Sequence, residues 1–135
     1  MTDLRRDDDQ DVPQDARREH TVADDSLDAL VAAPDHHRVI LENESVRVLD
    51  TSIPPGDTTP LHTHAWPSVL HILSWSSFVR RDERGKVLLD SRTMRELSTS
   101  PGTIWSGPLG PHTLENVGTT TLHVIAIEIK QPHGE

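Results

Sequence analysis

From Arg38 onward, short runs of hydrophobic and β-branched residues alternate with clusters of Gly, Pro, Asn and Asp. Runs of this kind, separated by turn residues at a spacing of roughly 8–12 residues, are typical of a sandwich or barrel of antiparallel strands. The chain is therefore expected to be all-β. The expected strands are Arg38–Glu42, Val46–Ile53, Val69–Leu73, Ser76–Arg81, Lys86–Asp90, His112–Asn116 and Thr121–Ile129.

The last of these runs is apolar on both faces. Strand side chains alternate, so Ile125 and Ile127 point to one face while Val124 and Ala126 point to the other. We expect this strand to be covered on both sides, by a barrel interior and by either a neighbouring layer or a dimer partner. A homodimer is the expected assembly.

The N-terminal part of the chain has a different pattern. Residues 1–25 are strongly charged, contain no aromatic residue and show no apolar period, which predicts a disordered acidic arm. Residues 26–135 are then the single folded domain. Ser26 is placed to cap a short helix through Leu27, Leu30 and Val31, which Pro34 would end.

Composition narrows the functional classes. The net charge is −9, and residues 1–35 carry −7 of it, from ten Asp and one Glu against four Arg. The remaining hundred residues are near neutral, which argues against nucleic-acid binding. No apolar run approaches the roughly 20 residues that cross a bilayer. The N-terminus lacks the apolar middle of a secretory signal, so a cytoplasmic protein without membrane contact is expected. With no cysteine in the chain, disulfides and thiolate chemistry are excluded.

Histidines carry the candidate chemistry, nine of them in 135 residues. His62 and His64 are two residues apart, so on a strand both imidazoles point to one face and can converge on one metal ion. Taken alone, this pair is weak support for a metal site. The adjacent pair His36 and His37 is weaker, because neighbouring strand residues face opposite ways.

The setting of these histidines strengthens the metal hypothesis. Residues 56–64 read Gly, five residues, His62, one residue, His64; residues 102–116 contain Gly102, Pro108, Gly110, His112 and Asn116 in order. The two stretches resemble the two motifs of the cupin superfamily, over about residues 35–130. The resemblance implies a small antiparallel β-barrel, or jelly roll, in which both motifs meet inside. It also implies that His62, His64 and His112 are metal ligands.

The sequence departs from the cupin pattern in three places: the second Gly of the first motif is absent, the second motif is one residue short between Gly110 and His112, and the fourth ligand differs. The glutamate of the first motif would fall at Ser68 or Val69, and neither supplies an anionic ligand. If Val69 takes that position, His71 also faces the pocket as a fourth ligand or proton carrier. If Ser68 takes it, His71 faces outward. A proline such as Pro67 can shift the alternation, so both registers stay open.

A neutral three-histidine set suits one divalent ion, with Fe(II) favoured and Zn, Ni, Cu or Mn as alternatives. Open coordination positions and an uncompensated double charge favour a small anionic, chelating substrate. The chain resembles the β-diketone-cleaving dioxygenases among three-histidine cupins. A mononuclear non-haem Fe(II) dioxygenase-like enzyme is therefore expected, with a non-catalytic metal- or ligand-binding cupin as the alternative.

Residues flanking the motifs are candidates for substrate contact. Trp66, His71 and Trp105 are expected to line the pocket, although core or dimer packing explains the two tryptophans equally well. Arg80 and Arg81 precede a hairpin turn. They are interpreted as a solvated edge, with contact to a substrate anion as the alternative for one of them.

Overall fold

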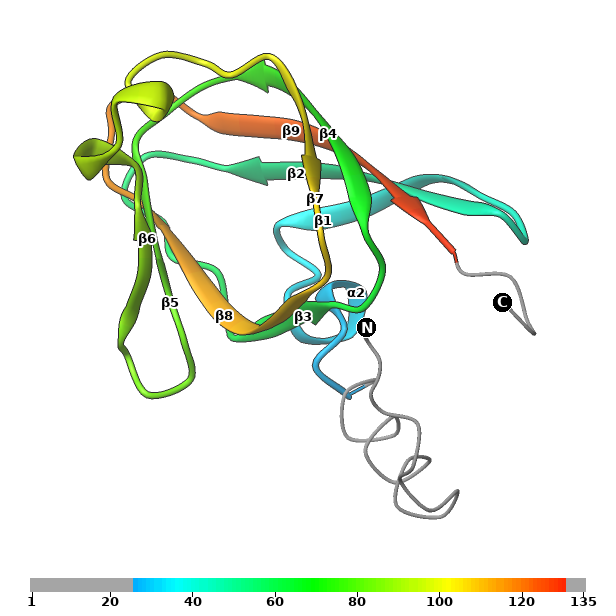
Figure 1. Cartoon of the computed structure of the whole chain (residues 1–135). Helices are drawn as coiled ribbons and strands as arrows, with labels where there is room; N and C mark the ends of the chain where they lie inside the picture. Colours follow the sequence, from blue (N-terminus) through cyan, green and yellow to red (C-terminus); the bar gives the residue numbers. More distant parts are fainter. Residues whose placement is uncertain (1–25, 131–135) are drawn as a thin grey trace.

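A computed structural model describes residues 26–130, which form two antiparallel sheets facing each other around a central cavity (Figure 1). One sheet has the order β1-β2-β9-β4-β7 and the other the order β3-β8-β5-β6. The strands are β1 (His37–Glu42), β2 (Val46–Ile53), β3 (His62–His64), β4 (Ser68–Ser74), β5 (Phe78–Arg81), β6 (Val87–Asp90), β7 (Thr103–Ser106), β8 (Leu109–Asn116) and β9 (Leu122–Ile129).

Alternation along the strands separates an inner from an outer face. In β9 the residues at even positions from Leu122 to Glu128 are buried, whereas those at odd positions are only partly buried. Inner residues of the two sheets meet in a core of Ile53, Phe78, Leu122 and Val124. The all-β barrel expected from the sequence is thus confirmed.

Most strand predictions agree with the structure to within two or three residues. Two strands were missed, β3 and β7, and β8 begins at Leu109 rather than His112. Each of these segments lies among Pro and Gly residues, which read as turns when taken alone. Two 3-10 helices, η1 (Ser91–Thr93) and η2 (Arg95–Leu97), were also missed.

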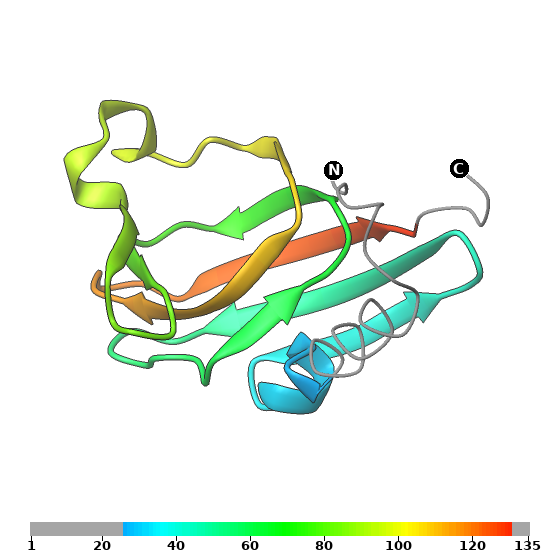
Figure 2. The same cartoon turned by 60° about the horizontal axis from the view of Figure 1, so that its bottom comes forward.

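The short helix α2 (Ala29–Ala32) lies beside β1 and β3 (Figure 2). Its N-cap is Asp28, whose carboxylate accepts a hydrogen bond from the Leu30 N–H at 3.1 Å. The expected cap at Ser26 was wrong by two residues. Ala29 packs in a second core cluster with Leu49 and Ala126.

The expectation about the acidic arm lies outside residues 26–130, and the expectation about the membrane is checked only within them. The acidic arm of residues 1–25 is not among the described residues, so its predicted disorder stays a prediction. Within the described part of the chain, no helix is long and apolar enough to cross a membrane.

Candidate metal centre

The histidines of the two motifs meet at one end of the barrel interior. In the β3–β8 ladder, His62 lies directly opposite His112, and the centroids of their rings are 4.4 Å apart. The ring of His64 lies 5.0 Å from that of His62 and 5.7 Å from that of His112. The structure therefore brings together the three histidines that the motifs single out.

A fourth histidine, His37, joins them from β1. Its ring centroid lies 4.8 Å from that of His62 and 5.4 Å from that of His64. One ring nitrogen from each of His37, His62 and His64 lies within 4.8 Å of the others, a spacing that fits a shared metal ion. The sequence interpretation set His37 aside because adjacent strand residues diverge. The same alternation, however, points one of the two histidines, His37, into the barrel.

Each of the four rings is held through its Nδ1 atom. His62 Nδ1 lies 2.8 Å from the Pro60 carbonyl, and His112 Nδ1 lies 2.7 Å from the Gly110 carbonyl, two residues earlier in each case. His37 Nδ1 lies 2.9 Å from the Ala33 carbonyl. Because a carbonyl only accepts, these Nδ1 atoms carry the proton, which leaves each Nε2 with a free lone pair.

His64 differs in that its Nδ1 donates to a carboxylate, Glu128 Oε2, at 2.9 Å. The side chain of Glu128 is almost completely buried, and its other oxygen accepts from Arg47 Nε at 2.7 Å. Arg47 in turn donates through two nitrogens to Asp28, at 2.9 and 3.0 Å. A chain of alternating charges thus runs from the cap of α2 to the imidazole of His64. Carboxylate–histidine pairs of this kind orient metal ligands and raise their basicity.

Burial keeps the imidazoles of His62, His37 and His112 neutral at pH 7. It is the main cause that lowers the pKa of His62 to about 3, and the neighbouring His112 adds to the effect. Burial likewise lowers the pKa of His37 and of His112 to about 4 each. A neutral imidazole is the form that binds a metal, so the donor set fits a metal ion of the kind that imidazole prefers.

The position of the missing glutamate can now be assigned. Ser68 is buried and lines the cavity, whereas Val69 does not, so Ser68 occupies the inward position. Ser68 also lies directly opposite Glu128 in the β4–β9 ladder, and opposite residues share a face. The site therefore does have a carboxylate, that of Glu128 on the neighbouring strand β9. It contacts His64 rather than the position of a metal ion.

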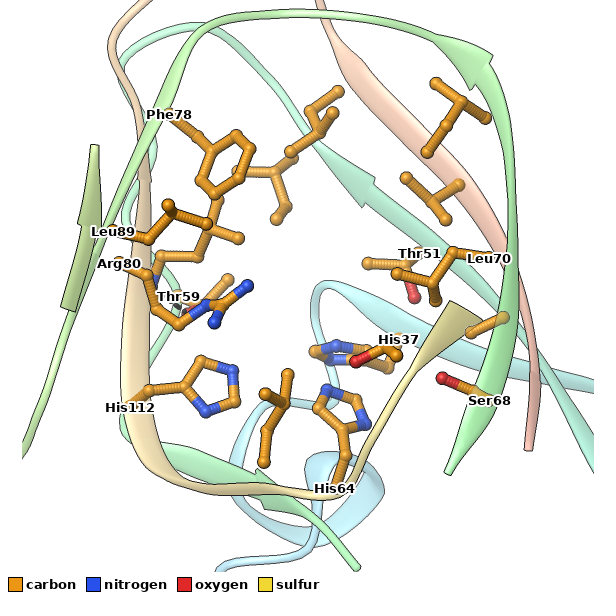
Figure 3. Close-up of a pocket in the computed structure, with 18 of the residues that line it drawn as sticks. His37, Thr51, Thr59, His64, Ser68, Leu70, Phe78, Arg80, Leu89 and His112 are labelled. Atoms are coloured by element: carbon orange, nitrogen blue, oxygen red, sulfur yellow. Dashed lines mark hydrogen bonds between the residues drawn. The ribbon is translucent and has the colours of Figure 1, made fainter. Parts of the chain in front are cut away.

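The cavity continues from the histidines into an apolar chamber of about 170 Å³ in all (Figure 3). Its inner wall is made mostly of aliphatic and aromatic side chains, and Phe78, Leu89 and Leu70 are among them. Arg80 extends from β5 toward the centre of this space, beside His112 (Figure 3). The site thus has a polar end that suits a metal and an apolar end that suits the body of a small molecule.

The three residues expected to contact substrate do not line this cavity. His71 is exposed on the outer face of β4, where its Nδ1 lies 2.9 Å from Thr103 Oγ1. Trp105 is 63% exposed. The ring of Trp66 lies 5.1 Å from the Arg47 guanidinium and 5.5 Å from Lys130 Nζ. Inward positions on β4 and β7 belong instead to their neighbours, among them Ser68 and Ser106.

Comparison with known proteins adds the fold family. No protein-family profile matches the sequence, and no curated protein matches it. Solved structures do match. A cupin domain from Bordetella pertussis Tohama I is 22% identical, with a TM-score of 0.53 over 70% of this chain and 92% of that one.

Two further matches have lower TM-scores. An RmlC-like cupin family protein with a double-stranded β-helix fold from Methanocaldococcus jannaschii is 12% identical, with a TM-score of 0.49 over 69% of this chain and 77% of that one. The polyketide cyclase RemF from Streptomyces resistomycificus is 17% identical, with a TM-score of 0.48 over 74% and 68%.

The fold is therefore the double-stranded β-helix of the cupins. Within that fold, the chain is one whose barrel holds a histidine cluster able to bind a metal ion.

Proposed function

We propose that this chain binds one divalent metal ion through His62, His64 and His112 and acts as a mononuclear, non-haem Fe(II) dioxygenase-like enzyme on a small anionic chelating substrate. The observation that carries the proposal is the common orientation of the imidazoles. Each donates from Nδ1 to an oxygen atom, so each has an Nε2 lone pair available for a metal.

His37 extends the donor set to four. Its ring is held by the Ala33 carbonyl in the same way and lies within ligand distance of His62 and His64. In this proposal His37 takes the place on the metal that the motif glutamate would fill. Because imidazole is neutral and glutamate is not, the exchange leaves the double charge of the ion uncompensated by its direct ligands.

When bound by these histidines, Fe(II) would supply Lewis-acid and oxygen-activating chemistry. The chain's own residues supply the surroundings. Glu128 and the carbonyls of Pro60 and Gly110 fix the imidazole planes, and Phe78, Leu89 and Leu70 exclude water from the substrate.

Metal analysis of the purified protein tests the binding step. We expect about one ion per chain in the native protein, and strong loss in His62→Ala and His112→Ala. His71→Ala is the matched control, since His71 lies on the outer face of the barrel. Absence of metal from the native protein, or full metal content in His62→Ala, would contradict the proposal.

Oxygen uptake distinguishes the enzyme from a non-catalytic binding cupin. The Fe(II)-loaded protein is expected to consume oxygen with at least one member of a panel of β-diketones and related chelating acids. The His64→Ala variant should lose this activity. Bound metal without oxygen uptake for any member of the panel would favour the binding function instead.

A further inference from the structure

Arg80 lies inside the barrel, where no side chain of the described residues pairs with it. It faces inward from β5, opposite Leu114 of β8 and Leu89 of β6, and it lines the cavity. Its Nε is buried and has no hydrogen-bond partner among the described residues. Burial lowers the pKa of the guanidinium, yet arginine remains charged at neutral pH.

Two other arginines of the described residues are paired with carboxylates. Arg47 binds both Asp28 and Glu128. Arg81, the next residue along the chain, points outward and binds Glu115 at 2.8 Å. Among the described residues, the buried Arg47 is thus paired with carboxylates, whereas Arg80, whose Nε is buried, is not.

The remaining lining of the cavity supplies no negative charge. Among the described residues that form its wall there is no Asp or Glu, and no Lys. Arg80 is therefore the only Arg, Lys, Asp or Glu among the described residues that line the cavity. An unpaired charge in an apolar space is strongly unfavourable, and an incoming anion would relieve it.

We propose that Arg80 binds the carboxylate of the ligand, and that the ligand class is a small carboxylic acid with an apolar body. The planar guanidinium offers two parallel donors that match a carboxylate. Phe78 and Leu89, beside Arg80 in the chamber, then contact the apolar body (Figure 3). This inference rests on the proposed function, since the same molecule reaches the metal from the chamber.

A pair of probes that differ only in charge tests the assignment. Benzoate carries the carboxylate, and benzamide is its neutral counterpart of nearly equal shape. Calorimetric titration of the metal-free protein should show benzoate binding at least about tenfold more tightly than benzamide. Omitting the metal separates this test from the metal proposal, because benzoate binding does not require the ion.

Two variants identify the residue. Arg80→Met should abolish the preference for benzoate, and Arg80→Lys should keep part of it, because a charge remains without the planar fork. Arg81→Met is the matched control and should keep the full preference. Arg80→Met is also expected to raise the melting temperature of the ligand-free protein, because it removes an unpaired buried charge.

The role of Arg80 and the metal proposal predict different results. Equal binding of benzoate and benzamide by the native protein, no benzoate binding at all, or an undiminished preference in Arg80→Met would each overturn the role of Arg80. If benzoate binds as expected while the metal analysis finds no ion, the anion site stands and the proposed metal function fails.

Discussion

Single hydrogen bonds decide what the histidines of this barrel can do. An imidazole with a proton on Nε2 would present a donor to the interior, whereas one with a proton on Nδ1 presents a lone pair. The carbonyls of Pro60 and Gly110 select the second state for His62 and His112, and Glu128 selects it for His64. Oxygen atoms that never touch the metal would thus control its binding.

The carboxylate of Glu128 is the most sensitive of these atoms to replacement. Glu128→Gln removes a buried negative charge between Arg47 and His64, so we expect a loss of stability of about 3–5 kcal/mol. We also expect metal affinity to fall by roughly 10–100-fold. Urea unfolding and metal titration measure the two effects.

Glu115→Gln is the control for this substitution, because the Arg81–Glu115 pair is a third exposed and such pairs contribute about 0–1 kcal/mol. A Glu128→Gln variant as stable as Glu115→Gln would show that the buried charge chain has no structural role.

Only some of the residues at the candidate site could be predicted from the sequence. The spacing of His62 and His64 placed both on one face of a strand, and the resemblance to the cupin motifs added His112. His37 and Glu128 had no such signal, since each reaches the site from a distant strand through the register of the sheet. Arg80 was grouped with Arg81 as a solvated edge, although alternation sends the two to opposite faces.

At the scale of elements, α2 is coupled to the histidine cluster through Asp28. This carboxylate caps the helix and also binds Arg47 of β2, which binds Glu128 of β9. Short strands such as β3 depend on such contacts, because the His62–His64 segment has only one ladder, with β8. The strands themselves were predictable from their alternation, apart from those bordered by Pro and Gly.

Two substitutions at Asp28 separate its roles. Asp28→Asn keeps an acceptor for the Leu30 N–H but removes the charge beside Arg47. Asp28→Ala removes both. We expect Asp28→Ala to be less stable than Asp28→Asn by about 1 kcal/mol, the usual value of an N-cap. Equal stability of the two variants in urea unfolding would mean that the cap contributes nothing.

At the scale of the whole molecule, the buried histidines make stability depend on pH. The pKa values of His62, His37 and His112 lie at about 3 to 4 in the fold and near 6.5 when unfolded. The unfolded chain therefore binds more protons between pH 6.5 and 4, and stability falls as the pH is lowered through that range. The slope is up to about 1.4 kcal/mol per pH unit for each histidine.

Urea unfolding of the metal-free protein at pH 7, 6 and 5 measures this slope. His112→Asn should make it shallower, since it removes one of the buried imidazoles. His71→Asn, on the outer face, should leave it as in the native protein. A stability that does not change between pH 7 and 5 would contradict the assignment of neutral, buried histidines.

The expected homodimer also belongs to this scale and stays a prediction. The outer face of the larger sheet carries apolar side chains that are only partly covered, with Trp105 63% and Leu73 52% exposed and Ile127 partly buried. Such a surface favours association. Light scattering coupled to size-exclusion chromatography should give twice the mass of one chain, and a monomer at all concentrations would contradict the expectation.

The segment before α2 contacts strand β3, so proteolysis in this segment should affect the histidines of β3. The Thr63 N–H donates to the Leu27 carbonyl at 2.7 Å, and Asp28 forms a β-bridge with Thr63, the residue between His62 and His64. Trimming by a protease should therefore leave the metal content unchanged as long as the cut falls before Leu27. A cut beyond Asp28 should release the ion. The metal content after proteolysis should therefore distinguish cuts before Leu27 from cuts after Asp28.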